Sequence, residues 1–335
     1  MLSKTINQRT IKRENQSGDT VKVLVTGGAG FIGHHLVAAL LENNCQVNIL
    51  DTKQVSDEKV EHLVKLGGKY FHGDITNYSD IDEAGTGCNH IVHLAAQTSV
   101  PESIQNPKLN NQVNIEGTKN VIRFANENNI EKLVFSSSAA IYGDCELNPI
   151  KEEYRGEIQS PYAVSKLKNE QDLLELLDDA IGVHILRFFN VYGGGQSLTS
   201  SYGAVIPSFI NLLMSGKSPV IFGDGKQTRD FIHVSDVVKL ITEIIQQGKF
   251  DRDCFNVATQ TETTISDLLT IIKAKIEENI PSISLPETTY RPERPGDISN
   301  SCADITRTKT QYDWQPTISI AEGIDSIIKS RVGGD

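Results

Sequence analysis

Apolar and polar positions follow a repeating order along the first half of the chain: an apolar run, a turn, then an amphipathic stretch. The apolar runs predict buried strands and the amphipathic stretches predict helices. Strands that alternate with helices require right-handed crossovers, which predicts a Rossmann-type α/β fold with a doubly wound parallel sheet. The expected strands are residues 21–26, 46–51, 69–72, 90–95, 132–138 and 183–189, and the expected helices are 31–43, 108–128 and 162–177.

The pattern changes after Asn190, where Gly and Pro become frequent and the helices become shorter. This composition predicts a smaller α/β lobe that closes over a ligand. Residues 231–247 resemble a strand–helix unit that could return to the main sheet. We expect a sheet domain at residues 21–190 with about 226–257, a second lobe at 191–225 and 258–331, and a flexible polar arm at 1–20.

Composition narrows the class of protein. The 335 residues are 38% hydrophobic and 22% charged, with no apolar run that could span a bilayer. The net charge of −11 argues against a general nucleic-acid binder. We therefore expect a cytoplasmic protein that binds neither membranes nor nucleic acid. Its cysteines are scattered and lack metal-type spacing, which predicts reduced thiols and no metal site: Cys45, Cys88, Cys145, Cys254 and Cys302.

A glycine-rich turn, Gly28-x-Gly30-x-x-Gly33, follows the first expected strand and opens the first expected helix. Glycines permit a tight turn and close approach of a pyrophosphate, which the helix N-terminus attracts. Asp51 ends the second expected strand, where a carboxylate would bind the adenosine ribose and repel a 2′-phosphate. The pattern favours NAD over NADP, although Lys53 points the other way.

Tyr162 and Lys166 are four residues apart in an expected helix, so they share one face. A free tyrosine has a pKa of about 10. A nearby lysine, helped by the charge of an oxidised nicotinamide, can lower that value. Tyr162 would then serve as an acid and base for a carbinol proton. The pair alone also suits an exposed helix face; the glycine-rich turn upstream favours catalysis.

With both motifs in place, the chain resembles the extended short-chain dehydrogenase/reductase family of nucleotide-sugar epimerases and dehydratases, from about Val21 to Trp314. The segments at residues 73–75, 93–97 and 113–114 are similar to the family's adenine, nicotinamide-ribose and buried cofactor segments. The resemblance implies that NAD is bound by Gly27, Gly28, Gly30, Phe31, Ile32, Gly33, Asp51, Asp74, Ile75, Leu94, Ala95, Ala96, Gln97, Asn114, Ser136, Tyr162 and Lys166.

Residues 136–143 resemble the family's active-site strand end. The resemblance implies that Ser138 bonds the sugar hydroxyl and acts with Tyr162 and Lys166 in catalysis. In the family's 4,6-dehydratases the residues after this hydroxyl are acidic, and the nucleotide-sugar decarboxylases also carry a carboxylate there. Here they are Ala139 and Ala140. Oxidation at carbon 4 stays possible, whereas elimination lacks its proton carriers.

Later segments resemble the family's substrate lobe. The resemblance implies that Arg229 and Arg294 grip the substrate diphosphate, as paired guanidinium donors can. It also places Ser301 beside the sugar 2-substituent, where a small residue admits N-acetyl groups. The substrate-binding residues implied are Ser138, Ala139, Asn190, Arg229, Arg294, Asp297 and Ser301.

The sequence thus predicts a UDP-sugar 4-epimerase that interconverts gluco and galacto forms through a 4-keto intermediate with bound NAD. Two alternatives stay open: an epimerase or reductase for another sugar nucleotide, such as UDP-glucuronate, and a catalytically silent NAD-binding regulator. The resemblance implies a homodimer with a four-helix interface formed by the helices near 108–128 and 162–177. His93 is expected to pack or bond the backbone, and adjacent His34 and His35 lack metal-ligand spacing.

Overall fold

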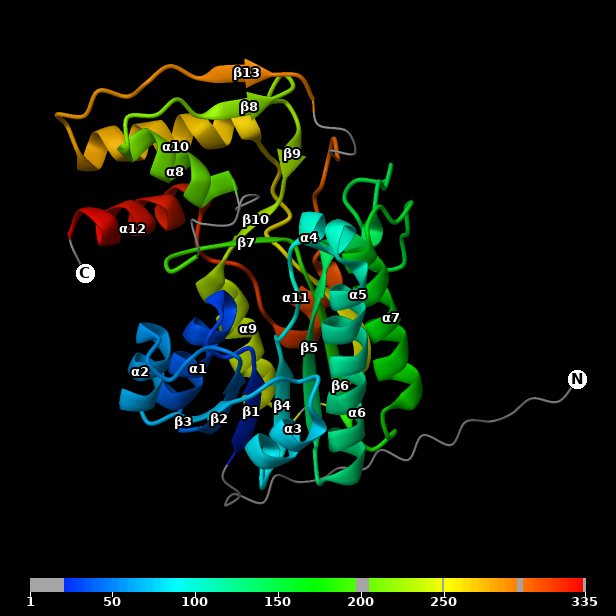
Figure 1. The fold of residues 1–335 in the computed structure, drawn as a ribbon. Helices are drawn as coiled ribbons and strands as arrows, with labels where there is room; N and C mark the ends of the chain where they lie inside the picture. The colour runs from blue at the N-terminus through cyan, green and yellow to red at the C-terminus, as the bar shows by residue number, and fades with distance from the viewer. Residues whose placement is uncertain (1–20, 197–204, 249, 294–297, 334–335) are drawn as a thin grey trace, which may run out of the picture.

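Parallel strands form the central sheet in the order β11-β6-β5-β4-β1-β2-β3 (Figure 1). This computed structural model describes residues 21–196, 205–248, 250–293 and 298–333, so the predicted arm at 1–20 lies outside it. The order confirms the predicted doubly wound parallel sheet, because the chain moves outward from β1 in both directions. The strands are β1 (Lys22–Thr26), β2 (Gln46–Asp51), β3 (Lys69–His72), β4 (His90–His93), β5 (Lys132–Ser138), β6 (Gly182–Phe188) and β11 (Arg252–Val257).

Helices cover both faces of this sheet because its strands are apolar on both sides. Val23 and Val25 face one hydrophobic core, and Leu24 between them faces the other. The first core is covered by α1 (Phe31–Glu42), α2 (Glu58–Lys65), α9 (Val234–Gln246) and α11 (Thr306–Tyr312). The second is covered by α3 (Tyr78–Gly85), α6 (Gly117–Glu127) and α7 (Pro161–Leu176).

The single helix predicted at residues 108–128 is wrong in one respect. The segment is divided into α5 (Pro107–Asn110), a π-helical turn η1 (Asn111–Glu116) and α6, and α4 (Val100–Gln105) precedes it. A π-helical turn is wider than an α-helical one and is frequent at functional sites. Here it contains Asn114, whose side chain is buried and bonded on several sides.

The strand predicted near residue 231 does not return to the main sheet. Strand β10 (Phe231–His233) pairs in parallel with β7 (Asn190–Tyr192) in a separate two-stranded sheet. The buried Asp230 carboxylate holds the start of β10 there, because it accepts backbone bonds from Thr259 and Gln260 at 2.8 and 2.9 Å. The following helix, α9, does pack on the main sheet, and β11 supplies the last strand of that sheet.

The smaller lobe has a hydrophobic core of its own and lies above the carboxyl ends of the strands in Figure 1. Its main elements are α8 (Val205–Met214), β8 (Val220–Phe222), α10 (Ile265–Asn279), β13 (Thr289–Arg291) and α12 (Ile320–Val332). A short antiparallel pair, β9 (Thr228–Arg229) and β12 (Thr263–Thr264), joins it to the residues near Asp230. Over the described residues, no helix is long and apolar enough to cross a membrane.

Candidate active site

The predicted cofactor residues lie at the carboxyl ends of neighbouring strands. Residues 27–33 follow β1, Asp51 ends β2, and Asp74 follows β3. On the other side of β1, residues 94–97 follow β4, and residues 136–138 end β5. In an open parallel sheet, ligands bind in the crevice outside these carboxyl ends, where the strand order reverses.

The glycine-rich turn is shaped for close backbone approach. Gly27 has φ +71°, and a Cβ there would lie 2.7 Å from the Ala95 nitrogen. A Cβ on Gly33 would lie 2.2 Å from the Gly27 carbonyl oxygen, so α1 can start this close to β1 only with glycine. The N-cap of α1 is Gly30, and no side chain caps its first turn. The amides of that turn are therefore suited to an anionic ligand. The partly buried residues around the turn are Gly30, Phe31, Ile32, Leu94, Ala95, Ala96 and Gln97.

Asp51 is bonded to the turn itself. Its Oδ2 accepts a hydrogen bond from the Ala29 amide at 2.9 Å, and its Oδ1 accepts one from the Lys53 amide at 3.1 Å. The Lys53 ammonium lies 3.2 Å from Asp57 and so has its own carboxylate partner. This geometry weakens Lys53 as an argument for NADP, because its charge is paired away from Asp51.

Asn114 is held by protein groups on both sides. Its Oδ1 accepts from the Gln97 amide at 2.8 Å, and its Nδ2 donates to the Gln97 carbonyl at 3.0 Å and to Ser165 Oγ at 3.1 Å. It therefore fixes the turn after β4 against α7. Near the predicted adenine position, Asp74 accepts from the Thr76 amide at 2.8 Å, and Ile75 is buried.

Tyr162 and Lys166 lie on the buried face of α7, as their spacing predicts. Their exposed fractions are 8% and 2%. Ser160 caps the helix through a 3.2 Å bond from the Ala163 amide, and Pro161 occupies its first position. Lys166 Nζ donates to the Ser136 carbonyl at 2.6 Å and lies 5.9 Å from the centroid of the Tyr162 ring. Helix α7 thus presents both side chains to the end of β5.

Burial governs the acid–base properties of this pair. It raises the pKa of the Tyr162 phenol above its ordinary value, and a hydrogen bond with Ser138 opposes part of that rise. It lowers the pKa of the Lys166 ammonium to about 7, against the opposing effect of the Glu170 carboxylate. The lowered phenol pKa predicted from the sequence is therefore not found in this arrangement, where Lys166 bonds a carbonyl instead of the phenol.

The three singled-out histidines have structural contacts. His93 is buried between the hydroxyls of Thr26 and Thr118, at 2.7 and 3.0 Å from its two ring nitrogens. It therefore packs as predicted, with side-chain hydroxyls instead of the backbone as partners. His34 bonds His62 at 3.1 Å, and His35 Nε2 donates to the Gly194 carbonyl at 2.9 Å. Among the described residues there is no group of His, Cys, Asp and Glu that could hold a metal ion.

Five of the seven predicted substrate residues lie in the described part of the chain. Arg229 Nη1 donates to the Ile298 carbonyl at 2.7 Å, and Asn190 Nδ2 donates to the Asp230 carbonyl at 3.1 Å. Ser301 is buried, with 8% exposure. Ser138 and Ala139 lie at the junction of β5 and the 3₁₀ turn η2 (Ala139–Tyr142). Arg294 and Asp297 lie outside the described residues.

A hollow of about 270 Å³ next to these residues was not predicted from the sequence. Its lining includes Phe222, Gln227 and Asn300, together with Ile298, whose carbonyl accepts from Arg229. Gln227 Nε2 donates to the Phe222 carbonyl at 2.8 Å. The sequence could have indicated this hollow, because Gln227 belongs to the segment 223–233 that carries Arg229 and Phe222 directly precedes that segment.

A parallel sheet with a glycine-rich turn, an acidic residue at the end of β2 and a Tyr–Lys helix packed on one face defines a dinucleotide-binding Rossmann protein. The model of the NAD dependent epimerase/dehydratase family matches residues 23–258. The chain belongs to this NAD-dependent family. Its residues fit the cofactor, since the uncapped start of α1 faces a turn that any Cβ at Gly27 would obstruct.

Several proteins of known name are similar over nearly the whole chain. A putative UDP-glucose 4-epimerase of Methanocaldococcus jannaschii is 34% identical over 311 residues, which cover 91% of this chain and 97% of that protein. The solved UDP-N-acetylglucosamine 4-epimerase of Methanobrevibacter ruminantium M1, in complex with UDP-N-acetylmuramic acid, is 33% identical. Its TM-score is 0.85, with 95% and 100% of the two chains covered.

The solved UDP-glucose 4-epimerase of Thermotoga maritima, with UDP-glucose, is 30% identical with a TM-score of 0.85, and 94% and 99% of the two chains are covered. Decarboxylases are also related. The UDP-N-acetyl-alpha-D-glucosaminuronate decarboxylase of Bacillus cytotoxicus is 26% identical, covering 92% of this chain and 97% of that protein. The family is therefore established, and the reaction has to be argued from the site.

Proposed function

We propose that this chain is a UDP-sugar 4-epimerase that interconverts gluco and galacto forms with bound NAD. The observation that carries the proposal is the end of β5. There Ser138 is close enough to the Tyr162 phenol to oppose the rise of its pKa, and the next two residues are Ala139 and Ala140. This arrangement supplies an acid and base for a hydroxyl proton. It has no carboxylate at the positions where the family's dehydratases and decarboxylases carry one.

In the proposed mechanism Tyr162 accepts the proton of the sugar 4-hydroxyl while Ser138 holds that oxygen. Lys166 stabilises the phenolate by its charge, since an opposite charge nearby favours the ionised form. Bound NAD⁺ supplies the hydride acceptor at carbon 4 and a positive charge that favours the phenolate. The 4-keto sugar then turns within the site, and Tyr162 returns the proton after reduction on the opposite face.

The substrate lobe is proposed to hold the nucleotide diphosphate. Arg229 and Arg294 would grip the phosphates, Asn190 would bond the same group, and Asp297 would bind the nucleotide ribose. Ala139 is small and partly buried beside Ser138, so it leaves room for the sugar. Ser301 is the proposed specificity residue: its small side chain supports acceptance of an N-acetyl group, and therefore of UDP-N-acetylglucosamine and UDP-N-acetylgalactosamine. Residues 21–190 with 226–257 are the proposed NAD-binding domain, and residues 191–225 with 258–331 the proposed substrate lobe.

A homodimer is proposed through the helices on one side of the sheet, where α4, α5, α6 and α7 lie together (Figure 1). Three apolar side chains are exposed on packed neighbours of this group: Ile104 on α4 at 59%, Leu109 on α5 at 44% and Val164 on α7 at 53%. A second copy that pairs the helices near 108–128 and 162–177 would bury them and form a four-helix interface.

Proton NMR of the purified protein with UDP-N-acetylglucosamine, then with UDP-glucose, tests the proposal with no cofactor added. Appearance of the galacto epimer is the expected result. Net oxidation of added NADH would identify a reductase instead. Turnover of UDP-glucuronate alone would show that the substrate is this other sugar nucleotide. If no sugar nucleotide reacts even with NAD supplied, the silent-regulator alternative replaces the enzyme.

A further inference from the structure

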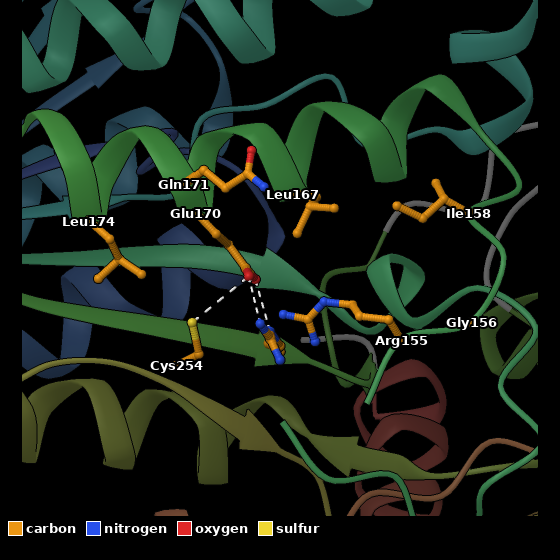
Figure 2. Close-up of a pocket in the computed structure, with 9 residues that line it drawn as sticks. Arg155, Gly156, Ile158, Leu167, Glu170, Gln171, Leu174 and Cys254 are labelled. Atoms are coloured by element: carbon orange, nitrogen blue, oxygen red, sulfur yellow. Dashed lines mark hydrogen bonds and ion pairs between the residues drawn. The ribbon is translucent and has the colours of Figure 1, made fainter. Parts of the chain in front are cut away.

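Glu170 lies on α7, about one helical turn beyond Lys166. Tyr162, Lys166 and Glu170 are spaced four residues apart and are all buried, so they share one helix face. Figure 2 shows Glu170 pointing from α7 toward Cys254 on β11, at the floor of a pocket of about 400 Å³. None of the residues predicted from the sequence for the active site lines this pocket.

The Glu170 carboxylate is held in place by a buried guanidinium. Arg187 Nε donates to Oε1 at 2.9 Å and Arg187 Nη2 donates to Oε2 at 2.7 Å. Ser137 on β5 also donates to Oε1. The paired, planar geometry fixes the orientation of the carboxylate. Glu170 is therefore a rigid negative charge between α7 and the sheet.

The Glu170–Arg187 ion pair is also connected to the residues that follow β5. Arg187 Nη1 donates to the Tyr142 hydroxyl at 3.0 Å and to the Glu152 carbonyl at 2.6 Å. Tyr142 belongs to the turn η2, which begins directly after Ser138. The pair thus connects the helix that carries Tyr162 to the turn that follows Ser138.

Lys166 lies in surroundings that disfavour its charge. It is 2% exposed, and its ammonium donates to one carbonyl, that of Ser136. The titratable groups that act on it or feel its charge are Glu170 on its own helix and His93 on β4, with Tyr162 one turn away. His93 does not attract the Lys166 ammonium, because an imidazole is neutral or positively charged, and Tyr162 is a phenol and not a carboxylate. Of these groups, Glu170 alone is an anion that favours the ammonium form.

We propose that Glu170 is a positioning residue that keeps Lys166 as an ammonium, with Arg187 fixing the carboxylate on the far side. The inference rests on the proposed function only for its catalytic consequence. A charged Lys166 is what the mechanism needs to stabilise the Tyr162 phenolate. The electrostatic relation between Glu170 and Lys166 can be measured without any sugar nucleotide.

The test is carbon NMR of protein labelled at lysine Cε, titrated with pH, with the Lys166 signal assigned by its loss in Lys166→Met. In Glu170→Gln the midpoint for Lys166 should fall by about one pH unit or more, since a close opposite charge shifts a pKa by one to three. The matched control is Asp172→Asn. Asp172 is a buried carboxylate on the same helix that bonds Lys168 at 2.6 Å and lies on another side of α7.

An unchanged Lys166 midpoint in Glu170→Gln, or an equal shift in Asp172→Asn, would overturn the proposal. Because Glu170→Gln leaves Arg187 buried and unpaired, it can fail to fold. The double variant Glu170→Gln, Arg187→Gln removes both charges, and its Lys166 midpoint should fall by less, because the loss of the Arg187 cation partly offsets the loss of the carboxylate. A wild-type midpoint in a folded double variant would also overturn the idea. If the shift is found in a protein that epimerises nothing, the charge relation stands and only the proposed function fails.

Discussion

His184 gives the clearest test of how burial controls charge in this fold. It lies on β6 with 0% exposure, and its Nδ1 contacts the Tyr312 hydroxyl at 2.7 Å. Its Nε2 has no hydrogen-bond partner among the described residues. Burial, followed by the charges of Lys132 and His90, lowers the pKa of His184 to about 3. The imidazole is outside the candidate site, so its effect on stability is separate from catalysis.

The sign of the pH dependence follows from proton binding. An unfolded histidine has a pKa of about 6.5, so between pH 6.5 and 3 the unfolded chain binds a proton at His184 that the folded chain does not. Stability is therefore complete above pH 6.5 and is lost as the pH falls toward 3. At pH 5 this group lowers the free energy of unfolding by about 2 kcal/mol relative to pH 8. The full loss, below pH 3, is about 5 kcal/mol.

The assay is urea denaturation at pH 8 and pH 5, followed by the fluorescence of Trp314. This is the single tryptophan of the chain, and it is buried in the first core. His184→Gln should lose about 2 kcal/mol less than the wild type between the two pH values, at equal protein concentration. The exposed His72→Gln is the control and should behave as the wild type does. An equal acid loss in His184→Gln and wild type would refute the argument that burial keeps this imidazole neutral.

Three further predictions concern the proposed activity and assembly. Tyr162→Phe should keep bound NAD and lower the epimerisation rate by about 10²-fold to 10⁴-fold, as expected when a general acid–base is removed; an active variant would exclude this base. Ser301→Tyr should suppress turnover of UDP-N-acetylglucosamine more than that of UDP-glucose, measured by proton NMR, and equal suppression would contradict its role in specificity. Leu109→Glu should halve the mass measured by light scattering, because it puts a charge in the proposed interface. The control Leu66→Glu, with 43% exposure against 44%, lies on another helix end and should leave the mass unchanged.

The cofactor side of the site was predictable because its signals are local. The glycine spacing, the carboxylate at the end of a strand and the four-residue spacing of Tyr162 and Lys166 each act within one turn or one strand–helix unit. Long-range contacts decide the features that were missed. The π-helical turn at Asn114 depends on partners in Gln97 and Ser165, and β10 is held outside the sheet by the contacts of Asp230. No local pattern encodes these pairings.

The ion pair between Glu170 and Arg187 is another feature that no local sequence pattern predicts. Arg187 opens a segment that resembles the family's sixth strand end, and Glu170 is one helical turn beyond Lys166. Each residue alone suits a surface salt bridge. The two charges meet only because β5 pairs in parallel with β6 and α7 packs across both strands. There Arg187 is 1% exposed and Glu170 is 2% exposed. Burial then fixes this ion pair on the helix face that carries a proposed catalytic lysine.

On the sugar side, the fold anchors the segment that carries Ser301. The resemblance that places Ser301 beside the sugar 2-substituent rests on Arg294, Asp297 and Ala303-Asp304. Ile150 donates to the Cys302 carbonyl at 2.8 Å and accepts from the Asp304 amide at 2.9 Å, while the Ala303 amide donates to Asp230 at 3.2 Å. Ser301 lies two residues before the anchored Ala303, and Ser301→Tyr tests whether this proposed specificity residue governs sugar choice.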